Sequence, residues 1–233
     1  MHFFTPIANY LLLFLCVLHD NHSAKASCIK QSNDIYGTLM KYIRKIYIIG
    51  INDIDNLKSK DSFEFITKGK KLSLYAQIAV RKLVEHNYDI PFDKISVVKD
   101  SYGKPYIREY PHIFFSIAHT ENVIAIGFSN KPIGIDIERN TEQYLKIAKR
   151  FFSDLEVQYI TECTNPREAF LEIWTKKEAY IKYLGLGLEK PLNSFCVFNE
   201  HLKHKFITLK FGEYTLSFYD GESNKIDYKI FGF

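Results

Sequence analysis

Two short stretches of this chain contain side chains that could take part in catalysis. In the first, Asp136 and Glu138 lie two residues apart, within a run that has isoleucine at every second position. Side chains alternate between the two faces of a strand, so the isoleucines would enter a core while both acids share the opposite face. Two neighbouring carboxylates repel each other unless a cation lies between them. The pattern predicts either a cation site or an ordinary solvated strand face.

The second stretch, from Trp174 to Lys182, has the pattern of a helix. Glu178 and Lys182 are four residues apart, so they lie on the same helix face. With Asp136 and Glu138 they would make a Mg²⁺ and phosphate site, because Mg²⁺ prefers carboxylate and phosphate oxygens. The simpler interpretations are a surface ion pair between Glu178 and Lys182 and a core position for Trp174.

Two residues further upstream could bind phosphate. Lys104 lies in the turn at 101–105, and His119 lies at the end of a predicted strand. Each has a structural alternative, since a turn lysine is often only solvated and a lone histidine often only packs. Their order ahead of the acidic strand and the helix favours a shared site.

The apolar periodicity predicts the elements that position these residues. Strands are expected over 45–51, 95–98, 114–119, 123–128, 132–138, 195–198, 206–209, 214–218 and 227–230. Helices are expected over 68–86, 144–152 and 166–184, the last ending at Gly185. Ser153 and Glu156 have the spacing of a capping box that begins one more helix. Both halves therefore mix strands with one long helix.

Composition narrows the class of protein. At 233 residues, with 46% apolar and 25% charged residues, the chain fits one large soluble domain or two small ones. A net charge of +4 without a long basic tract gives no reason to expect nucleic-acid binding. The four cysteines are widely spaced and form no Cys-x-x-Cys pair, so we expect reduced thiols and a cytoplasmic protein.

The first 39 residues are treated separately. They contain an apolar run at 11–18 that is as long as a signal-peptide core and too short to span a bilayer. No Lys or Arg precedes it, so a leader, translated upstream sequence and an extra helix all stay open. We expect an extension over 1–39, an N-terminal half over 40–130 and a C-terminal half over 131–233, with no stable membrane span in the folded domain.

The motifs together resemble the 4′-phosphopantetheinyl transferase superfamily, in its long, pseudo-dimeric type typified by the enzyme that activates surfactin synthetase. The chain supplies Ile-Gly-Ile-Asp-Ile-Glu at 133–138 and Trp-Thr-Lys-Lys-Glu-Ala at 174–179, followed by Lys182. Supporting matches are Tyr-Gly-Lys-Pro at 102–105, Ser-Ile-Ala-His at 116–119, Ile-Ala-Lys-Arg-Phe-Phe-Ser at 147–153 and Gly-Leu-Gly-Leu at 185–188. The resemblance covers roughly residues 45 to 233.

The resemblance implies an α+β fold of two similar halves, a pseudo-dimer in which each half is an antiparallel sheet packed with a long helix. The active site would lie at the interface of the halves. The implied reaction transfers the 4′-phosphopantetheine arm of coenzyme A to a serine of an acyl or peptidyl carrier protein and releases 3′,5′-ADP. The chain would act as a monomer.

The resemblance also implies roles for single residues. Asp136, Glu138 and Glu178 would hold Mg²⁺, with Glu178 also the base acting on the serine. Lys182 would neutralise or protonate the leaving phosphate. The implied coenzyme A contacts are Lys104, His119, Lys177, Ser73, Lys60 and Lys58.

Two departures from the family pattern affect the coenzyme contacts. Ala118 stands where the family usually has serine, and Leu72 stands where a basic residue is common, although Lys70 and Lys71 adjoin it. Two alternatives stay open at this stage. One is a Mg²⁺-dependent phosphohydrolase that uses the same carboxylates, and the other is a non-catalytic module that binds coenzyme A or a carrier.

Overall fold

The structure is a computed structural model that describes residues 44–50, 68–139, 142–222 and 228–232. The strands are β1 (Arg44–Gly50), β2 (Val97–Lys99), β3 (Pro105–Ile107), β4 (Phe114–Thr120), β5 (Val123–Ser129), β6 (Gly134–Arg139), β7 (Phe206–Phe211), β8 (Tyr214–Tyr219) and β9 (Tyr228–Phe231). The α-helices are α4 (Lys68–Tyr88), α5 (Tyr144–Phe151), α6 (Asp154–Glu162), α7 (Pro166–Leu184) and α8 (Glu200–Lys203). Short 3₁₀ helices cover Phe92–Lys94, Gly187–Glu189 and Leu192–Ser194.

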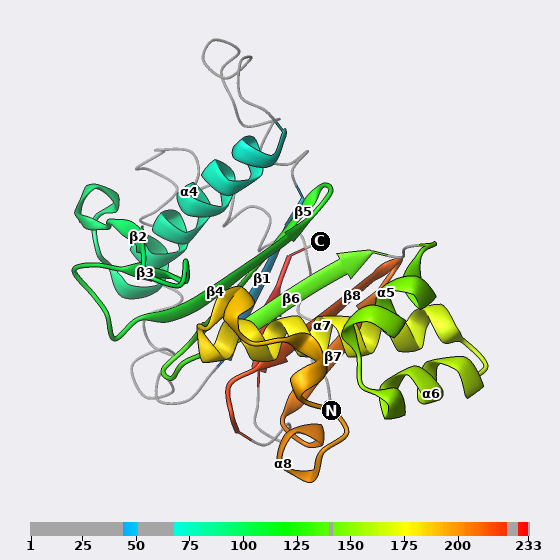
Figure 1. Cartoon of the computed structure of the whole chain (residues 1–233). Helices are drawn as coiled ribbons and strands as arrows, with labels where there is room; N and C mark the ends of the chain where they lie inside the picture. The colour runs from blue at the N-terminus through cyan, green and yellow to red at the C-terminus, as the bar shows by residue number, and fades with distance from the viewer. Residues whose placement is uncertain (1–43, 51–67, 140–141, 223–227, 233) are drawn as a thin grey trace.

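Two sheets and two groups of helices form four layers (Figure 1). One sheet has the order β4-β5-β1-β9, with α4 packed on its outer face, and the other has the order β6-β8-β7, with α7 packed on its outer face. A separate hairpin pairs β2 with β3. The expected mixture of antiparallel sheets and helices is confirmed, although β1 and β9 pair in parallel.

Strand alternation explains the layers. In β1, Tyr47 and Ile49 pack in the core under α4, while Ile46 and Ile48 pack between the two sheets. Across that second core, β6 contributes isoleucines and β8 contributes Phe218. The isoleucines of the acidic strand are therefore buried as expected, which leaves the intervening side chains of β6 for the face that packs against α7.

Local signals set the ends of the helices beside the site. Ser153 Oγ accepts a hydrogen bond from the Glu156 backbone N–H, and Glu156 Oε2 accepts one from the Ser153 N–H at 2.9 Å, which completes the expected capping box of α6. The long helix α7 ends at Gly185, whose φ of 71° lies in the left-handed region that favours glycine. Both predicted boundaries are confirmed.

The two sheets are tied together by contacts between distant parts of the chain. Ser116 Oγ on β4 accepts a hydrogen bond from the backbone N–H of Ile135 on β6, at 3.2 Å. Arg44 and Asp220 form a buried two-point ion pair, with Nε–Oδ2 and Nη2–Oδ1 distances of 2.5 and 2.6 Å. The last strand, β9, pairs with β1, so the expected 131–233 half contributes a strand to the sheet of the 40–130 half.

One predicted strand is wrong, and one strand was missed. Residues 195–198 form no strand, because their apolar side chains pack against α6 and α7 instead of entering a sheet. The missed strand is β3, which begins directly after the predicted turn. The extension expected over 1–39 lies outside the described residues. Among the helices that are described, none is long and apolar enough to cross a membrane.

Candidate active site

The acidic strand and the long helix meet face to face. A Cβ added to Gly134, at the start of β6, would lie only 1.8 Å from the backbone oxygen of Ala179 on α7. The absence of a side chain at Gly134 therefore lets the two backbones approach closely. This approach carries Asp136 and Glu138 towards the side of α7 that bears Glu178.

The side chains converge on a cavity of about 400 Å³. It is lined by Ile117, Ala118, His119, Asp136, Glu138, Trp174, Glu178 and Lys182. The cavity draws on β4 from one sheet, β6 from the other, and α7. The structure thus brings together five of the residues singled out from the sequence: both strand acids, both helix residues and the histidine.

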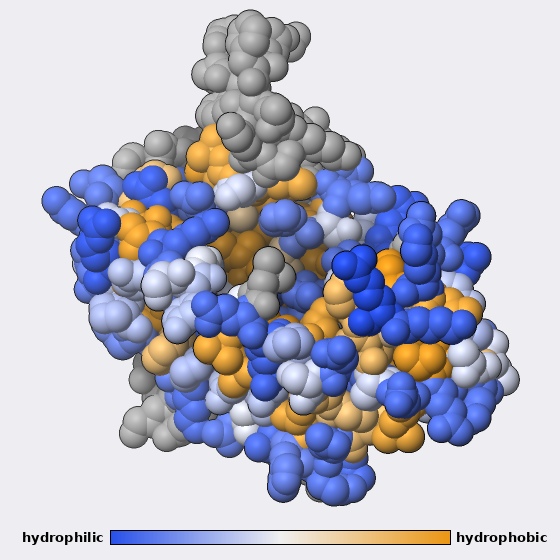
Figure 2. Space-filling view, viewed as in Figure 1, coloured by the Kyte–Doolittle hydropathy of each residue, from blue (hydrophilic) through white to orange (hydrophobic). Residues whose placement is uncertain are grey.

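A larger cavity of about 610 Å³ adjoins the first, since both are lined by Ile117, Glu178 and Lys182. Its lining includes Tyr102–Pro105 and Lys190–Asn193, with Phe151 and Ile181 among its apolar residues. The face of the molecule drawn in Figure 2 has a central hollow with apolar surface inside it and hydrophilic side chains around it. The smaller cavity is therefore the more charged of the two, and the larger cavity beside it is more apolar.

Lys182 pairs with Asp136 rather than with Glu178. Lys182 Nζ lies 2.7 Å from Asp136 Oδ1, which rules out the simple i,i+4 surface pair as the arrangement present here. The other oxygen of Asp136, Oδ2, is buried and has no hydrogen-bond partner. Burial raises the pKa of Asp136, and the Lys182 ammonium opposes that rise. One buried carboxylate oxygen is therefore left for a further cationic or donor group.

The charged forms of Glu138 and Glu178 are also disfavoured in this cavity. Burial, with the Asp136 carboxylate as a second cause, raises the pKa of Glu138 from 4.5 to about 7. The same two causes raise the pKa of Glu178. A cation in this cavity would relieve the repulsion among the three carboxylates. In the ranges described, however, no three His, Cys, Asp or Glu side chains are gathered closely enough to hold a metal as they stand.

The predicted phosphate-binding residues border the cavities. Burial, reinforced by the nearby Lys182 charge, lowers the pKa of His119, so its imidazole is neutral at neutral pH. Lys104 lines the larger cavity and donates from Nζ to the backbone oxygen of Tyr183 at 2.9 Å, at the C-terminal end of α7. Burial lowers the pKa of Lys104. Lys104 therefore both binds the C-terminal end of α7 and lines the larger cavity.

Of the remaining predicted coenzyme contacts, the two that the structure describes, Ser73 and Lys177, line neither cavity. Lys177 is completely buried and faces away from both cavities, with its ammonium 2.8 Å from Glu156 Oε2. Ser73 is half-buried on α4. Lys58 and Lys60 lie outside the described residues. At the two departures from the family pattern, Leu72 is packed in the core under α4 and Ala118 in the core between the sheets.

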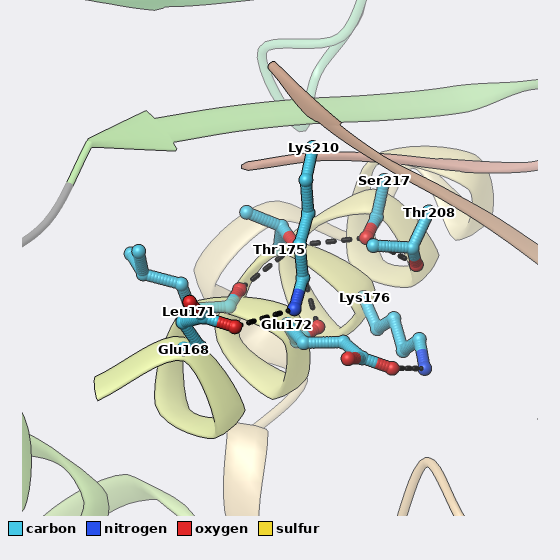
Figure 3. Close-up of polar contacts among 8 residues, drawn as sticks. All are labelled: Glu168, Leu171, Glu172, Thr175, Lys176, Thr208, Lys210 and Ser217. Atoms are coloured by element: carbon cyan, nitrogen blue, oxygen red, sulfur yellow. Dashed lines mark hydrogen bonds and ion pairs between the residues drawn. The ribbon is translucent and has the colours of Figure 1, made fainter. Parts of the chain in front are cut away.

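A buried chain of hydroxyl groups joins α7 to the β6-β8-β7 sheet, and the sequence motifs did not predict it. Figure 3 shows Thr175 Oγ1 2.8 Å from Ser217 Oγ on β8, which lies 3.0 Å from Thr208 Oγ1 on β7. Thr175 Oγ1 also lies 2.9 Å from the backbone oxygen of Leu171, one turn earlier in α7. The available signal was a threonine within the predicted helix, four residues after Leu171 and four before Ala179.

Trp174 packs against the core, as expected, but its side chain is only partly buried. Its ring packs in an aromatic group with Phe151, Phe152 and Phe170, with centroid distances of 6.4, 6.2 and 5.8 Å. The same residue lines the smaller cavity. It therefore belongs to the core and to the cavity wall.

Comparison with known proteins relates the C-terminal part of this chain to one family. Residues 132–230 match the model of the 4′-phosphopantetheinyl transferase superfamily, and this segment contains both acidic residues of β6 and all of α7. This segment is therefore similar to that superfamily, the one that the motifs of the chain resemble.

Individual relatives agree with the type that the motifs resemble. The chain is 38% identical over 127 residues to 4′-phosphopantetheinyl transferase gsp of Aneurinibacillus migulanus, covering 54% of this chain and 53% of the relative. It is 35% identical over 127 residues to 4′-phosphopantetheinyl transferase Sfp of Bacillus subtilis, covering 54% and 57%. A rat relative, L-aminoadipate-semialdehyde dehydrogenase-phosphopantetheinyl transferase, is 25% identical over 159 residues, covering 61% and 52%. The chain thus spans about half the length of the curated relatives it matches.

Proposed function

We propose that this protein transfers the 4′-phosphopantetheine group of coenzyme A to a serine of an acyl or peptidyl carrier protein and releases 3′,5′-ADP, in a Mg²⁺-dependent reaction. The observation that carries the proposal is the buried, unpartnered Oδ2 of Asp136, in a cavity it shares with Glu138, Glu178 and Lys182. This arrangement lies within the family segment. It provides anionic groups for a cation and a cationic group for a phosphate.

The donor set suits Mg²⁺. Asp136, Glu138 and Glu178 would hold the ion, since all three offer carboxylate oxygens and Mg²⁺ is bound in proteins through a few carboxylates together with phosphate and water oxygens. Two observations support this proposal: one Asp136 oxygen is buried without a hydrogen-bond partner, and the pKa values of all three acids are raised, so a cation would stabilise their charged forms. When bound, Mg²⁺ would neutralise negative charge on the diphosphate of coenzyme A.

The side chains themselves would move the proton and stabilise charge. The carrier serine oxygen forms a bond to the phosphorus of the phosphopantetheine group, and the bond from that phosphorus to the oxygen of 3′,5′-ADP breaks. Glu178, whose carboxylate lines the cavity, accepts the serine proton as the general base. Lys182, one helical turn further on, places its ammonium at the cavity to stabilise the leaving phosphate.

Other residues would bind and orient coenzyme A. His119 borders the smaller cavity and Lys104 the larger one, so both are positioned to contact phosphates of one ligand that lies across the two. Ser73, Lys58 and Lys60 stay proposals from the family resemblance. We do not propose Lys177 as a coenzyme contact, because protein groups already use its ammonium.

The wider setting is also proposed from the family. The chain would act as a monomer whose two halves form a pseudo-dimer, with the site between them, and it would work in the cytoplasm on cytoplasmic coenzyme A. Cavity residues from β4 on one sheet and from β6 and α7 beside the other support a site between halves.

The test is the mass of a purified apo carrier protein after incubation with this protein, coenzyme A and Mg²⁺. We expect the carrier to gain one phosphopantetheine group on its serine, and the matched surface variant Glu172→Gln to give the same product. Phosphate release without that adduct would indicate a phosphohydrolase and contradict the proposal. Binding of coenzyme A with neither product would indicate a non-catalytic module.

A further inference from the structure

A buried ion pair lies behind the candidate site, between Lys177 on α7 and Glu156 on α6. Both side chains are completely buried, and Lys177 Nζ lies 2.8 Å from Glu156 Oε2. Lys177 directly precedes Glu178 in the helix, so the ion pair lies next to the part of α7 that faces the cavity. A fully buried lysine and glutamate are rare unless each is paired and hydrogen-bonded.

The ammonium of Lys177 is fully used by protein groups. Besides Glu156, it donates hydrogen bonds to the backbone oxygens of Leu192 at 2.7 Å and Phe195 at 2.6 Å. It also lies 4.4 Å from the centre of the Phe195 ring. Because an ammonium has three N–H donors, no donor is left for a ligand.

Glu156 does more than cap its own helix. Oε2 accepts hydrogen bonds from the backbone N–H and the hydroxyl of Ser153, both at 2.9 Å. Oε1 accepts one from the backbone N–H of Val197, also at 2.9 Å. This one carboxylate therefore joins the beginning of α6, the middle of α7 and the segment 192–197.

The segment 192–197 continues from a wall of the larger cavity, to which Lys190–Asn193 contribute. It contains one short 3₁₀ helix, Leu192–Ser194, and no strand. Its place against the helices therefore depends on tertiary hydrogen bonds, and the bonds to Lys177 and Glu156 supply these at three of its residues. Tyr102–Pro105 also line this cavity.

We propose that Lys177 and Glu156 are positioning residues: they hold segment 192–197, so that its first two residues, Leu192 and Asn193, stay in the wall against which the uncharged pantetheine arm of coenzyme A lies. The larger cavity opens onto Glu178 and Lys182, and Ile181 and Leu192 give it an apolar lining suited to an uncharged chain. This inference rests on the proposed function, but the state of the wall can be measured without any turnover.

The experiment compares three variants of the full chain. The double variant Lys177→Met/Glu156→Gln removes both charges together, so neither is left buried and unpaired. The methionine side chain has no donor for the Leu192 and Phe195 oxygens. The matched control is Lys176→Met/Glu172→Gln, which removes the neighbouring i,i+4 pair on the outer side of the same helix. The third is the single variant Glu156→Gln.

For the double variant we expect a folded protein with faster backbone amide exchange in segment 192–197. The KM for coenzyme A should rise about tenfold, which corresponds to about 1.4 kcal/mol of lost binding. The kcat should change by less than about threefold, because the groups that react stay in place. The control should match the wild type in amide exchange and in both kinetic constants.

Wild-type amide exchange and KM in the double variant would overturn the proposal. If the wild-type protein catalyses no transfer, the proposed function fails while the inference is still decided, by amide exchange and by calorimetric binding of coenzyme A. If the double variant does not fold, Glu156→Gln decides. Faster amide exchange at Val197 would support the positioning role, and unchanged exchange there would contradict it.

Discussion

The close approach of β6 and α7 at Gly134 makes the sharpest prediction about the site. In Gly134→Ala, the new Cβ would lie 1.8 Å from the Ala179 oxygen and 2.5 Å from the backbone nitrogen of Tyr183. Real Cβ atoms essentially never approach other atoms closer than 3.0 Å, so the strand and the helix must separate by more than 1 Å at this point. Both contacts are to backbone, and no side chain can rotate away to relieve them.

The separation should affect activity more than stability. Overpacking of this kind costs about 1–3 kcal/mol of folding stability. Because Asp136 and Glu138 move with the strand while Glu178 moves with the helix, the acids would lose their relative positions, and a misplacement of about 1 Å can cost about 100-fold in rate. We expect a folded variant with kcat/KM for carrier modification reduced about 100-fold.

The assay is carrier modification by mass, beside thermal unfolding of the same preparation. Gly212→Ala is the matched control, because Gly212 has a φ of 55° in the β7–β8 turn and an added Cβ would meet nothing within 4 Å. That variant should lose about 1 kcal/mol of stability to backbone strain and keep wild-type activity. Wild-type activity in Gly134→Ala would refute the reasoning that the close approach positions the carboxylates.

Three more predictions concern charge. The pKa of Glu138 is raised from 4.5 to about 7, so the folded chain binds more protons than the unfolded chain between those values. Its stability in urea should therefore fall by about 2 kcal/mol as the pH rises from about 5 to about 8, after allowance for partial exposure, and Mg²⁺ should reduce that fall. Lys182→Met leaves Asp136 buried without its cation, so we expect a loss of about 2–3 kcal/mol at neutral pH and a smaller loss in acid, seen by urea unfolding at both pH values. Asp220→Asn should cost about 3 kcal/mol by the same assay, because it removes the carboxylate that neutralises the buried Arg44 guanidinium, whereas breaking the exposed Lys210–Glu168 pair should cost less than about 1 kcal/mol. Equal losses for the buried and the exposed pair would contradict that last prediction.

Local patterns carried most of the secondary structure and the centre of the site. The 3/4 spacing of apolar residues predicted α4 at 68–86, and the glycine at 185 predicted the end of α7 at 184; the structure has α4 at Lys68–Tyr88 and α7 at Pro166–Leu184. The alternating isoleucines predicted which face of β6 bears the acids. The sequence also predicted one site formed by the acids of this strand and the charged residues of α7. In the structure β6 and α7 pack directly on each other.

What the sequence did not predict depends on contacts between distant residues. Successive helix residues differ by about 100° in direction, so Glu178 faces the cavity while Lys177 faces α6. Nothing near Lys177 in the sequence shows that a glutamate 21 positions earlier is its partner. The aromatic stretch at 195–198 was taken for a strand because composition alone does not distinguish sheet packing from packing onto a helix. The pairing of β9 with β1 joins the two ends of the described chain and has no local signal.

The central claim is that Glu178 acts on the carrier serine at a site held by buried carboxylates. The most direct measurement is the rate of phosphopantetheine transfer by Glu178→Gln, with coenzyme A binding followed by calorimetry and folding by thermal unfolding. We expect a rate lower by about 10²- to 10⁴-fold, the usual contribution of a general base, in a folded protein that still binds coenzyme A. Transfer at the wild-type rate by this variant would contradict the claim.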